Sequence, residues 1–128
     1  MDTERGEAIA KTYLTALATQ DIGLIKTLFA DDATLEDPIG SERRSGIAAI
    51  CGFYEAAFQM EFTAVPTGPV GCADRYVAFA FTLGYLDDGK KMEVDTIDIF
   101  EINDDGKVAS MRAYWSEKNR HPAVSGNG

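Results

Sequence analysis

The stretch from Tyr76 to Trp115, YVAFAFTLGYLDDGKKMEVDTIDIFEINDDGKVASMRAYW, decides the fold. Apolar and polar residues alternate over residues 76–86, 91–102 and 107–115, as they do in half-buried β-strands. The polar, glycine-containing runs between these segments are typical of tight hairpin connections. The second half of the chain is therefore predicted to form a three-stranded antiparallel meander.

The first half of the chain has the period of helices instead. Apolar residues recur at spacings of three and four in three segments, residues 3–19, 21–29 and 46–58. Asp21 is suited to cap the second helix, and Asp31-Asp32 is expected to end it. Between the second and third helices, residues 33–36 fit a short strand.

Helices followed by an antiparallel meander predict one α+β domain over residues 1–128. A curved, mainly antiparallel sheet is expected to wrap the three helices on its concave side. The tail from about residue 120 is expected to be flexible.

The formal net charge of -9 makes nucleic acids and anionic membrane surfaces poor partners. The longest basic runs are the pairs Arg43-Arg44 and Lys90-Lys91. The start of the chain lacks the basic and apolar regions of a signal peptide, and eighteen apolar residues never run together. We therefore expect a cytoplasmic protein with no nucleic-acid partner and no membrane association.

The cysteine and histidine content gives no sign of a metal or cofactor. Cys51 and Cys72 lie in different predicted elements and belong to no CxxC pair, so we expect free, buried thiols. The single histidine, His121, lies in the polar tail, which leaves no His pair or Cys/His cluster for a metal. A Ser-His-Asp triad would have to recruit that tail residue.

The middle strand of the meander places an acid among apolar side chains. Its alternation puts Asp98 on the more apolar face and Asp95 on the opposite face. A buried aspartate without a cationic partner has a raised pKa, so Asp98 is expected to be protonated and to donate a hydrogen bond. Two other interpretations stay open: Asp98 near a sheet edge beside a cation, or a one-residue slip that buries Asp95 instead.

Periodicity alone does not show that Tyr13 and Asp37 belong to the same site as Asp98. Tyr13 faces the core side of its helix, which by itself favours an ordinary core tyrosine with its hydroxyl at the rim. Asp37 precedes Pro38, a common place for a turn acid, and the proline favours an extended backbone at Asp37. The apolar rows on the flanking strands are suited to a structural core, and to a ligand pocket only if a polar group projects into them.

The order and spacing of five segments nevertheless resemble the bacterial ketosteroid isomerases (steroid Δ-isomerases). The resemblance extends from about residue 7 to residue 119. The segments that carry it are Tyr13, FADDATLEDPIG at residues 29–40, Phe53-Tyr54, DTID at residues 95–98 and AYWSE at residues 113–117.

The resemblance implies a cone-shaped fold of the nuclear transport factor 2-like (NTF2-like, SnoaL-like) superfamily and a homodimer. It gives Asp37 the role of general base, Tyr13 and Asp98 the oxyanion hole, and Tyr54 a supporting hydrogen bond to Tyr13. Phe29 stands where some members have a further tyrosine, which implies a shorter hydrogen-bonded chain behind Tyr13. The expected substrate-binding side chains are Phe53, Phe79, Phe81, Leu83, Met111 and Trp115.

The implied reaction is a transposition of a carbon–carbon double bond in a 3-oxo-Δ5-steroid. A proton moves from C4 to C6 through a dienolate, by general acid–base catalysis without a metal or other cofactor. The same fold hosts epoxide hydrolases and dehydratases, but Arg112 is expected on the outer strand face and no histidine is expected in the pocket. A carrier that binds an apolar ligand without turnover is the alternative that is not an enzyme.

Overall fold

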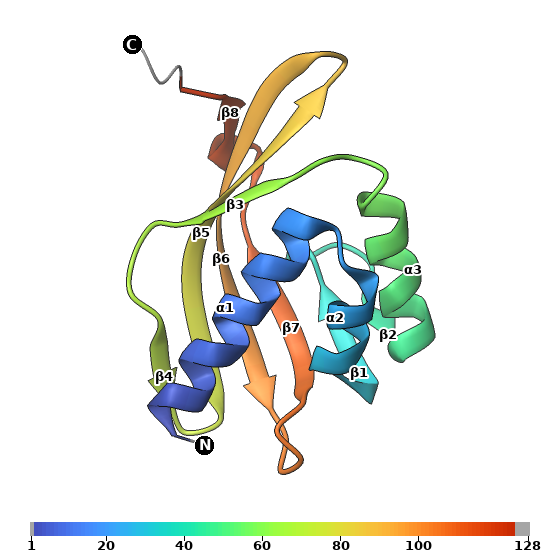
Figure 1. Ribbon diagram of the computed structural model, residues 1–128, viewed down its shortest axis with the longest axis vertical. Helices are drawn as coiled ribbons and strands as arrows, with labels where there is room; N and C mark the ends of the chain where they lie inside the picture. The colour runs from blue at the N-terminus through green and yellow to red at the C-terminus, as the bar shows by residue number, and fades with distance from the viewer. Residues whose placement is uncertain (1, 125–128) are drawn as a thin grey trace.

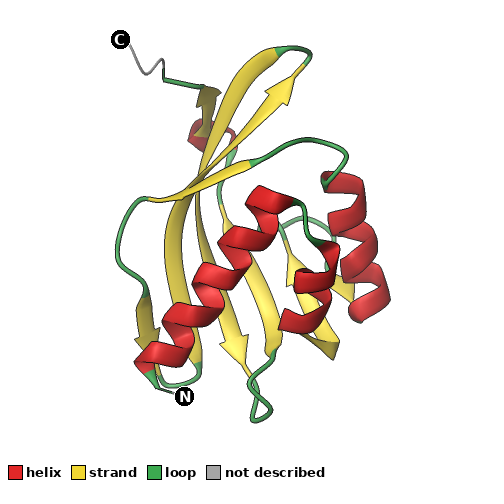
Figure 2. Cartoon of the chain, viewed as in Figure 1, coloured by secondary structure: helices red, strands yellow, loops and turns green. Residues whose placement is uncertain are grey.

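Three helices pack on one face of a curved sheet in the computed structural model, which describes residues 2–124 (Figure 1). These helices are α1 (Thr3–Thr19), α2 (Ile22–Leu28) and α3 (Ile47–Ala57). Figure 2 shows them side by side in front of the strands. The sequence predictions for α1 and α3 are confirmed within one residue at each end.

The junction between α2 and the sheet differs from its prediction. Asp21 caps α2 as expected, and its carboxylate accepts a hydrogen bond from Leu24 N at 3.1 Å. The helix ends at Leu28, before Asp31-Asp32, and strand β1 (Phe29–Glu36) begins at once. The expected strand over residues 33–36 is therefore only the second half of β1.

The meander is confirmed as strands β5 (Tyr76–Asp87), β6 (Lys90–Ile102) and β7 (Val108–Tyr114). Asp88 and Gly89 both have positive φ, which makes the β5–β6 connection the two-residue turn whose twist matches antiparallel strands. Gly106 also has positive φ in the β6–β7 connection. The two glycine-containing runs therefore reverse the chain where the sequence predicted.

Five shorter elements complete the fold: β2 (Arg44–Ser45), β3 (Thr63–Pro66), β4 (Gly71–Ala73), the 3-10 helix η1 (Glu117–Asn119) and β8 (Arg120–Pro122). Among the described residues the main strand order is β2-β1-β7-β6-β5-β3, with β4 on β5 and β8 on β6. All pairs are antiparallel except β1 with β7. The sheet is mixed, mostly antiparallel and not closed into a barrel.

The tail does not start where the sequence suggested. Arg120–Pro122 form β8 and pair with Met92, Glu93 and Val94 of β6. His121 is held there, since its Nε2 lies 2.8 Å from Asp95 Oδ2. The expectation of a free tail from about residue 120 therefore fails up to Pro122, and residues 125–128 lie outside the described residues.

The core lies between the helices and the concave face of the sheet. Tyr13 and Ile25 from the helices and Val77 and Phe100 from the sheet are almost completely buried in it. Both cysteines are free thiols, as expected, but they are half-buried where the sequence predicted burial. No helix of the described chain combines the length and the apolar character needed to cross a membrane.

Candidate active site

One cavity brings together the three predicted catalytic residues, Tyr13, Asp37 and Asp98. Tyr13 comes from the middle of α1, Asp37 follows the end of β1, and Asp98 lies in the middle of β6. The cavity has a volume of about 130 Å³. Its other lining residues are Leu17, Phe53, Tyr54, Ala57, Phe62, Phe81, Leu83, Val94, Thr96 and Trp115.

Asp98 is the buried acid of the site. It pairs with Phe79 and Ala113 on the neighbouring strands and is 1% exposed, so the interpretations with Asp98 near an edge or with Asp95 buried are both wrong. Burial raises its pKa well above the ordinary value, and the charge of Asp37 adds to this. Only the Thr96 hydroxyl opposes the shift, by donating to Asp98 Oδ1 at 3.1 Å.

Asp37 is placed by the parallel pairing of β1 with β7. Glu36 lies opposite Arg112, and beyond the strand end Ile39 N donates to Ala113 O at 2.9 Å. This arrangement brings Asp37 beside Trp115, whose indole Nε1 donates to Asp37 Oδ1 at 2.7 Å. Burial raises the pKa of Asp37, while the hydrogen bond from Trp115 and the charge of Arg44 lower it.

Tyr13 is held rigidly by aromatic neighbours. Its ring makes edge-to-face contacts with Phe100 at a centroid distance of 5.0 Å and with Phe79 at 6.0 Å. Its hydroxyl lies 2.8 Å from the hydroxyl of Tyr54. Burial is the main reason that the pKa values of both tyrosines lie well above the ordinary value, so both hydroxyls stay protonated.

The predicted substrate-binding residues divide into two groups. Phe53, Phe81, Leu83 and Trp115 line the cavity, whereas Phe79 and Met111 do not and instead pack in the core. The structure does not bring those two to the cavity, because one strand face continues from the cavity into the core. Sequence reasoning missed five lining residues: Leu17, Ala57, Phe62, Val94 and Thr96.

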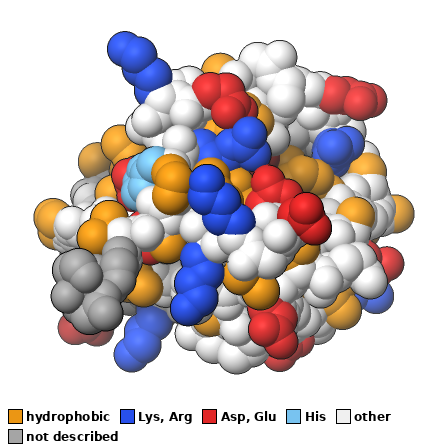
Figure 3. Space-filling view, turned by 90° about the horizontal axis from the view of Figure 1, so that it is seen from above, with side chains coloured by type: hydrophobic (Ala, Val, Ile, Leu, Met, Phe, Trp, Pro, Cys, Tyr) orange, Lys and Arg blue, Asp and Glu red, His pale blue; other side chains and the backbone are white. Residues whose placement is uncertain are grey.

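Two larger hollows lie elsewhere on the surface. One, of about 580 Å³, shares Phe62 with the cavity and runs over the inner face of the β5–β6 hairpin, where Tyr85 lies opposite Met92. Viewed from this end, the molecule shows charged side chains of both signs among apolar ones (Figure 3). The groove therefore adjoins the cavity at Phe62.

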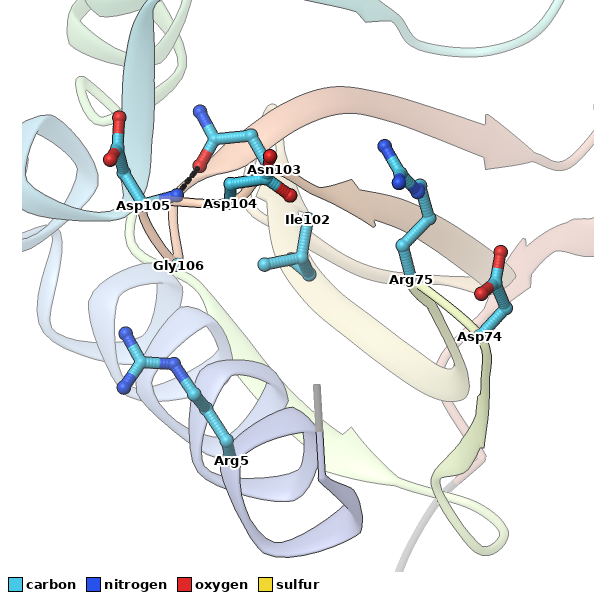
Figure 4. A pocket seen from close by; sticks show the side chains of 8 residues that line it. All are labelled: Arg5, Asp74, Arg75, Ile102, Asn103, Asp104, Asp105 and Gly106. Atoms are coloured by element: carbon cyan, nitrogen blue, oxygen red, sulfur yellow. Dashed lines mark hydrogen bonds between the residues drawn. The ribbon is translucent and has the colours of Figure 1, made fainter.

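The other hollow, of about 500 Å³, lies at the opposite end of α1 (Figure 4). Arg5 reaches it from α1, Arg75 from the β4–β5 turn, and Asp105 from the β6–β7 turn. It contains none of the predicted site residues and carries charges of both signs. We therefore assign the candidate active site to the smaller cavity with the buried acid.

No group of three His, Cys, Asp and Glu side chains within residues 2–124 is arranged to hold a metal ion. Asp37 and Asp98 are the only acids among the described residues that line the cavity. The arrangement therefore offers acid–base chemistry: a half-buried carboxylate, a deeply buried acid with a raised pKa, and a tyrosine hydroxyl.

The burial of Asp98 predicts that the protein loses stability as the pH rises. The pKa of Asp98 is higher in the folded than in the unfolded chain, so unfolding releases a proton. The free energy of unfolding should therefore fall from about pH 4, the ordinary pKa of aspartate, towards the raised pKa, by at most about 1.4 kcal/mol per pH unit. Asp98→Asn removes this ionisation and should gain stability relative to the wild type over the same range.

Urea unfolding of both proteins between about pH 4 and pH 8 measures that difference. A difference that does not change with pH would show that Asp98 has the same pKa in the folded and unfolded chains.

Three comparisons place the chain among known proteins. The model of the SnoaL-like domain matches residues 10–111. A protein of Nocardioides simplex named Steroid Delta-isomerase is 34% identical over 116 residues, which cover 91% of this chain and 93% of that protein. A solved structure of the epoxide hydrolase/cyclase-like enzyme SalBIII, described for its role in pyran ring formation in the polyether salinomycin, has a TM-score of 0.88 at 26% identity.

The structural match covers 95% of this chain and 98% of the other, so the NTF2-like fold expected from the resemblance is confirmed. The two relatives are named for different reactions. Because one fold can support several chemistries, the side chains of the cavity must distinguish between them.

Proposed function

Since the chain belongs to the family of SnoaL-like domains and is 34% identical to a protein named Steroid Delta-isomerase, we propose that it is a steroid Δ5–Δ4 isomerase. The observation that carries the proposal is the position of Asp98, buried in the same cavity as Asp37 and Tyr13. An acid with a raised pKa and a half-buried carboxylate suit a reaction that moves one proton while charge develops on an oxygen.

Asp37 is the general base of the proposed reaction. It takes a proton from C4 of a 3-oxo-Δ5-steroid, and the electron pair of the broken C–H bond moves into the dienolate. The protonated Asp37 then returns the same proton to C6, which leaves the double bond conjugated with the ketone. The hydrogen bond from Trp115 supports this role, because it favours the ionised form of Asp37 before the first transfer.

Tyr13 and protonated Asp98 donate hydrogen bonds to the C3 oxygen as it becomes negative. Tyr13 donates to the substrate while Tyr54 donates to Tyr13, an arrangement that the 2.8 Å separation of their hydroxyls supports. Thr96 occupies Asp98 Oδ1, so the acidic proton resides on Oδ2. Both donors are in place before the reaction starts, which is the condition for stabilising the transition state.

The steroid enters with its reacting ring first. The cavity of about 130 Å³ is smaller than the usual ligand pocket of roughly 300–1,000 Å³. It therefore holds the ring that reacts, between Phe53, Phe81 and Trp115, while the rest of the skeleton passes Phe62 into the groove along the hairpin.

The resemblance to SalBIII makes an epoxide hydrolase or cyclase the second candidate. An epoxide hydrolase of this fold would be expected to use an Asp-Arg-Asp arrangement around a water molecule. Arg112 is exposed, and no arginine or lysine of the described chain lines the cavity. The side chains present therefore favour the isomerase.

Mixing the purified protein with 5-androstene-3,17-dione and recording ultraviolet absorbance tests the proposal, because only the conjugated product absorbs strongly. Rapid, protein-dependent growth of the absorbance is the expected result. Binding of the steroid without turnover would indicate a carrier and overturn the isomerase. If the steroid is neither bound nor turned over, epoxides become the next substrates to test.

We also propose that the protein is a homodimer formed through the sheet face that the helices leave uncovered. Ile97 on β6 and its neighbour Tyr114 on β7 are 50% and 43% exposed there, which is unusual for adjacent apolar side chains. Sedimentation equilibrium should give a dimer for the wild type and a monomer for Ile97→Lys. Met60→Lys, at an exposed apolar position after α3, should stay dimeric; a monomeric wild type would contradict the proposal.

A further inference from the structure

Arg44 has an unusual position at the edge of the candidate site. It lies in β2, opposite Leu35 of β1, two residues before Asp37. Its guanidinium carbon lies 4.9 Å from the centroid of the Phe53 ring. Phe53 belongs to α3 and lines the cavity, so Arg44 packs against a wall of the site although it does not line the cavity itself.

The neighbouring Arg43 differs from Arg44 in its charge partners. Arg43 donates from Nε and Nη2 to Glu36 Oε1 at 3.0 and 2.9 Å, so its charge is neutralised by an ion pair. No carboxylate in the described part of the chain lies within ion-pair distance of Arg44. The charge of Arg44 is therefore available to act on other groups.

Asp37 is the site acid that this charge affects. The positive charge of Arg44 lowers the pKa of Asp37, in the same direction as the hydrogen bond from Trp115 and against the effect of burial. Arg44 is half-buried, so water screens its charge less than that of an exposed arginine. A cation held by an aromatic ring also keeps a fixed position relative to the cavity.

On the basis of the isomerase proposed above, we propose that Arg44 is a positioning residue with two effects on the reaction. Its guanidinium holds the Phe53 ring in place against the substrate, and its charge keeps Asp37 ready to accept a proton. Arg44 touches neither the substrate nor the reacting atoms.

Two substitutions separate the two effects. Arg44→Gln removes the charge but keeps a planar, shorter side chain at this position, whereas Arg44→Lys keeps the charge but loses the planar guanidinium. Arg43→Gln is the matched control, because it removes one positive charge from the adjacent residue, where Glu36 already neutralises it. Thermal unfolding of all three variants confirms that they fold.

The pH dependence of kcat/KM should distinguish the variants. The base must be ionised, so kcat/KM falls as the pH drops through the pKa of Asp37 in the free enzyme. Without the cation this pKa rises, and Arg44→Gln should have a severalfold lower kcat/KM on the acid side with an unchanged plateau at higher pH. Arg44→Lys should keep the acid limb of the wild type but show a severalfold higher KM.

Carbon-13 NMR of aspartate-labelled protein gives the ionisation of Asp37 without any substrate. The titration of Asp37 should move to higher pH in Arg44→Gln and stay in place in Arg44→Lys and Arg43→Gln. Because this titration needs no turnover, it tests Arg44 even if the steroid proves not to be a substrate. An unchanged titration of Asp37 in Arg44→Gln, or an equal shift in Arg43→Gln, would overturn the electrostatic effect. An unchanged KM in Arg44→Lys would overturn the effect on Phe53.

Discussion

Replacing Asp37 with asparagine should reduce the proposed steroid isomerisation by about 10⁴-fold, the upper end of what a general base contributes. Asparagine has nearly the same shape, and its carbonyl oxygen still accepts the hydrogen bond from Trp115 Nε1. The amide is not basic at neutral pH, so it neither takes the C4 proton nor returns one to C6. The rate of absorbance growth with 5-androstene-3,17-dione measures the loss.

Glu36→Gln provides the control for Asp37→Asn. Glu36 is the adjacent acid, but its carboxylate pairs with Arg43 and does not line the cavity. The control should retain nearly all activity, and circular dichroism should show that both variants are folded. Substantial turnover by Asp37→Asn would remove Asp37 from the mechanism, whatever the control does.

Replacing Asp98 with leucine should lower kcat by about 10²–10³-fold, the usual effect of losing one oxyanion-hole donor. Leucine has the same branching as aspartate and its apolar side chain suits the buried surroundings of β6, but it donates no hydrogen bond to the C3 oxygen in the proposed reaction. Asp98→Asn should be milder, because an amide N–H still donates. Rates for the three proteins under saturating steroid give the comparison.

The comparison of Asp98→Asn with Asp98→Leu tests whether Asp98 acts by donating a hydrogen bond. Thr96 can still donate to the asparagine carbonyl, so the amide nitrogen takes the place of the carboxyl oxygen that faces the substrate. Equal losses in Asp98→Asn and Asp98→Leu would show that hydrogen donation is not the role of Asp98. Circular dichroism of both variants checks that the loss does not come from unfolding.

The long strands could be predicted because their signals are local. Alternation over many residues, together with turns such as Asp88-Gly89, identifies β5, β6 and β7 without knowledge of their partners. β3 and β4 are too short for a clear period, and β3 ends in Pro66. Their place depends on pairing with β5, which is a property of the whole fold.

The site could be predicted in part for the same reason. Alternation alone places Asp98 on the buried face of β6, and the structure confirms it. Alternation does not show where a cavity ends, so Phe79 seemed equivalent to Phe81, although only Phe81 lines it. Phe62 lies between α3 and β3, where no periodic signal exists.

The contacts of Asp37 could not be predicted from local sequence. Trp115 is 78 residues away along the chain and was expected to bind substrate only by its apolar surface. Its hydrogen bond to Asp37 depends on the parallel pairing of β1 with β7, which joins the first strand to the last strand of the meander. Resemblance to a family suggested the proposed role of Asp37, and the structure supplies its hydrogen-bond partner.

The parallel pairing of β1 with β7 also affects the order in which the molecule assembles. β1 and the helices emerge from the ribosome first, with one edge of β1 paired to β2 and the other edge unpaired until β7 is made. Contacts between residues so far apart in the chain form slowly, and an open strand edge beside uncovered apolar helix faces is prone to aggregation. In a nascent chain that stops before β7, β1 therefore lacks its partner strand and Asp37 lacks Trp115. The exposed edge of β1 and the apolar helix faces are then the surface that a chaperone would need to cover.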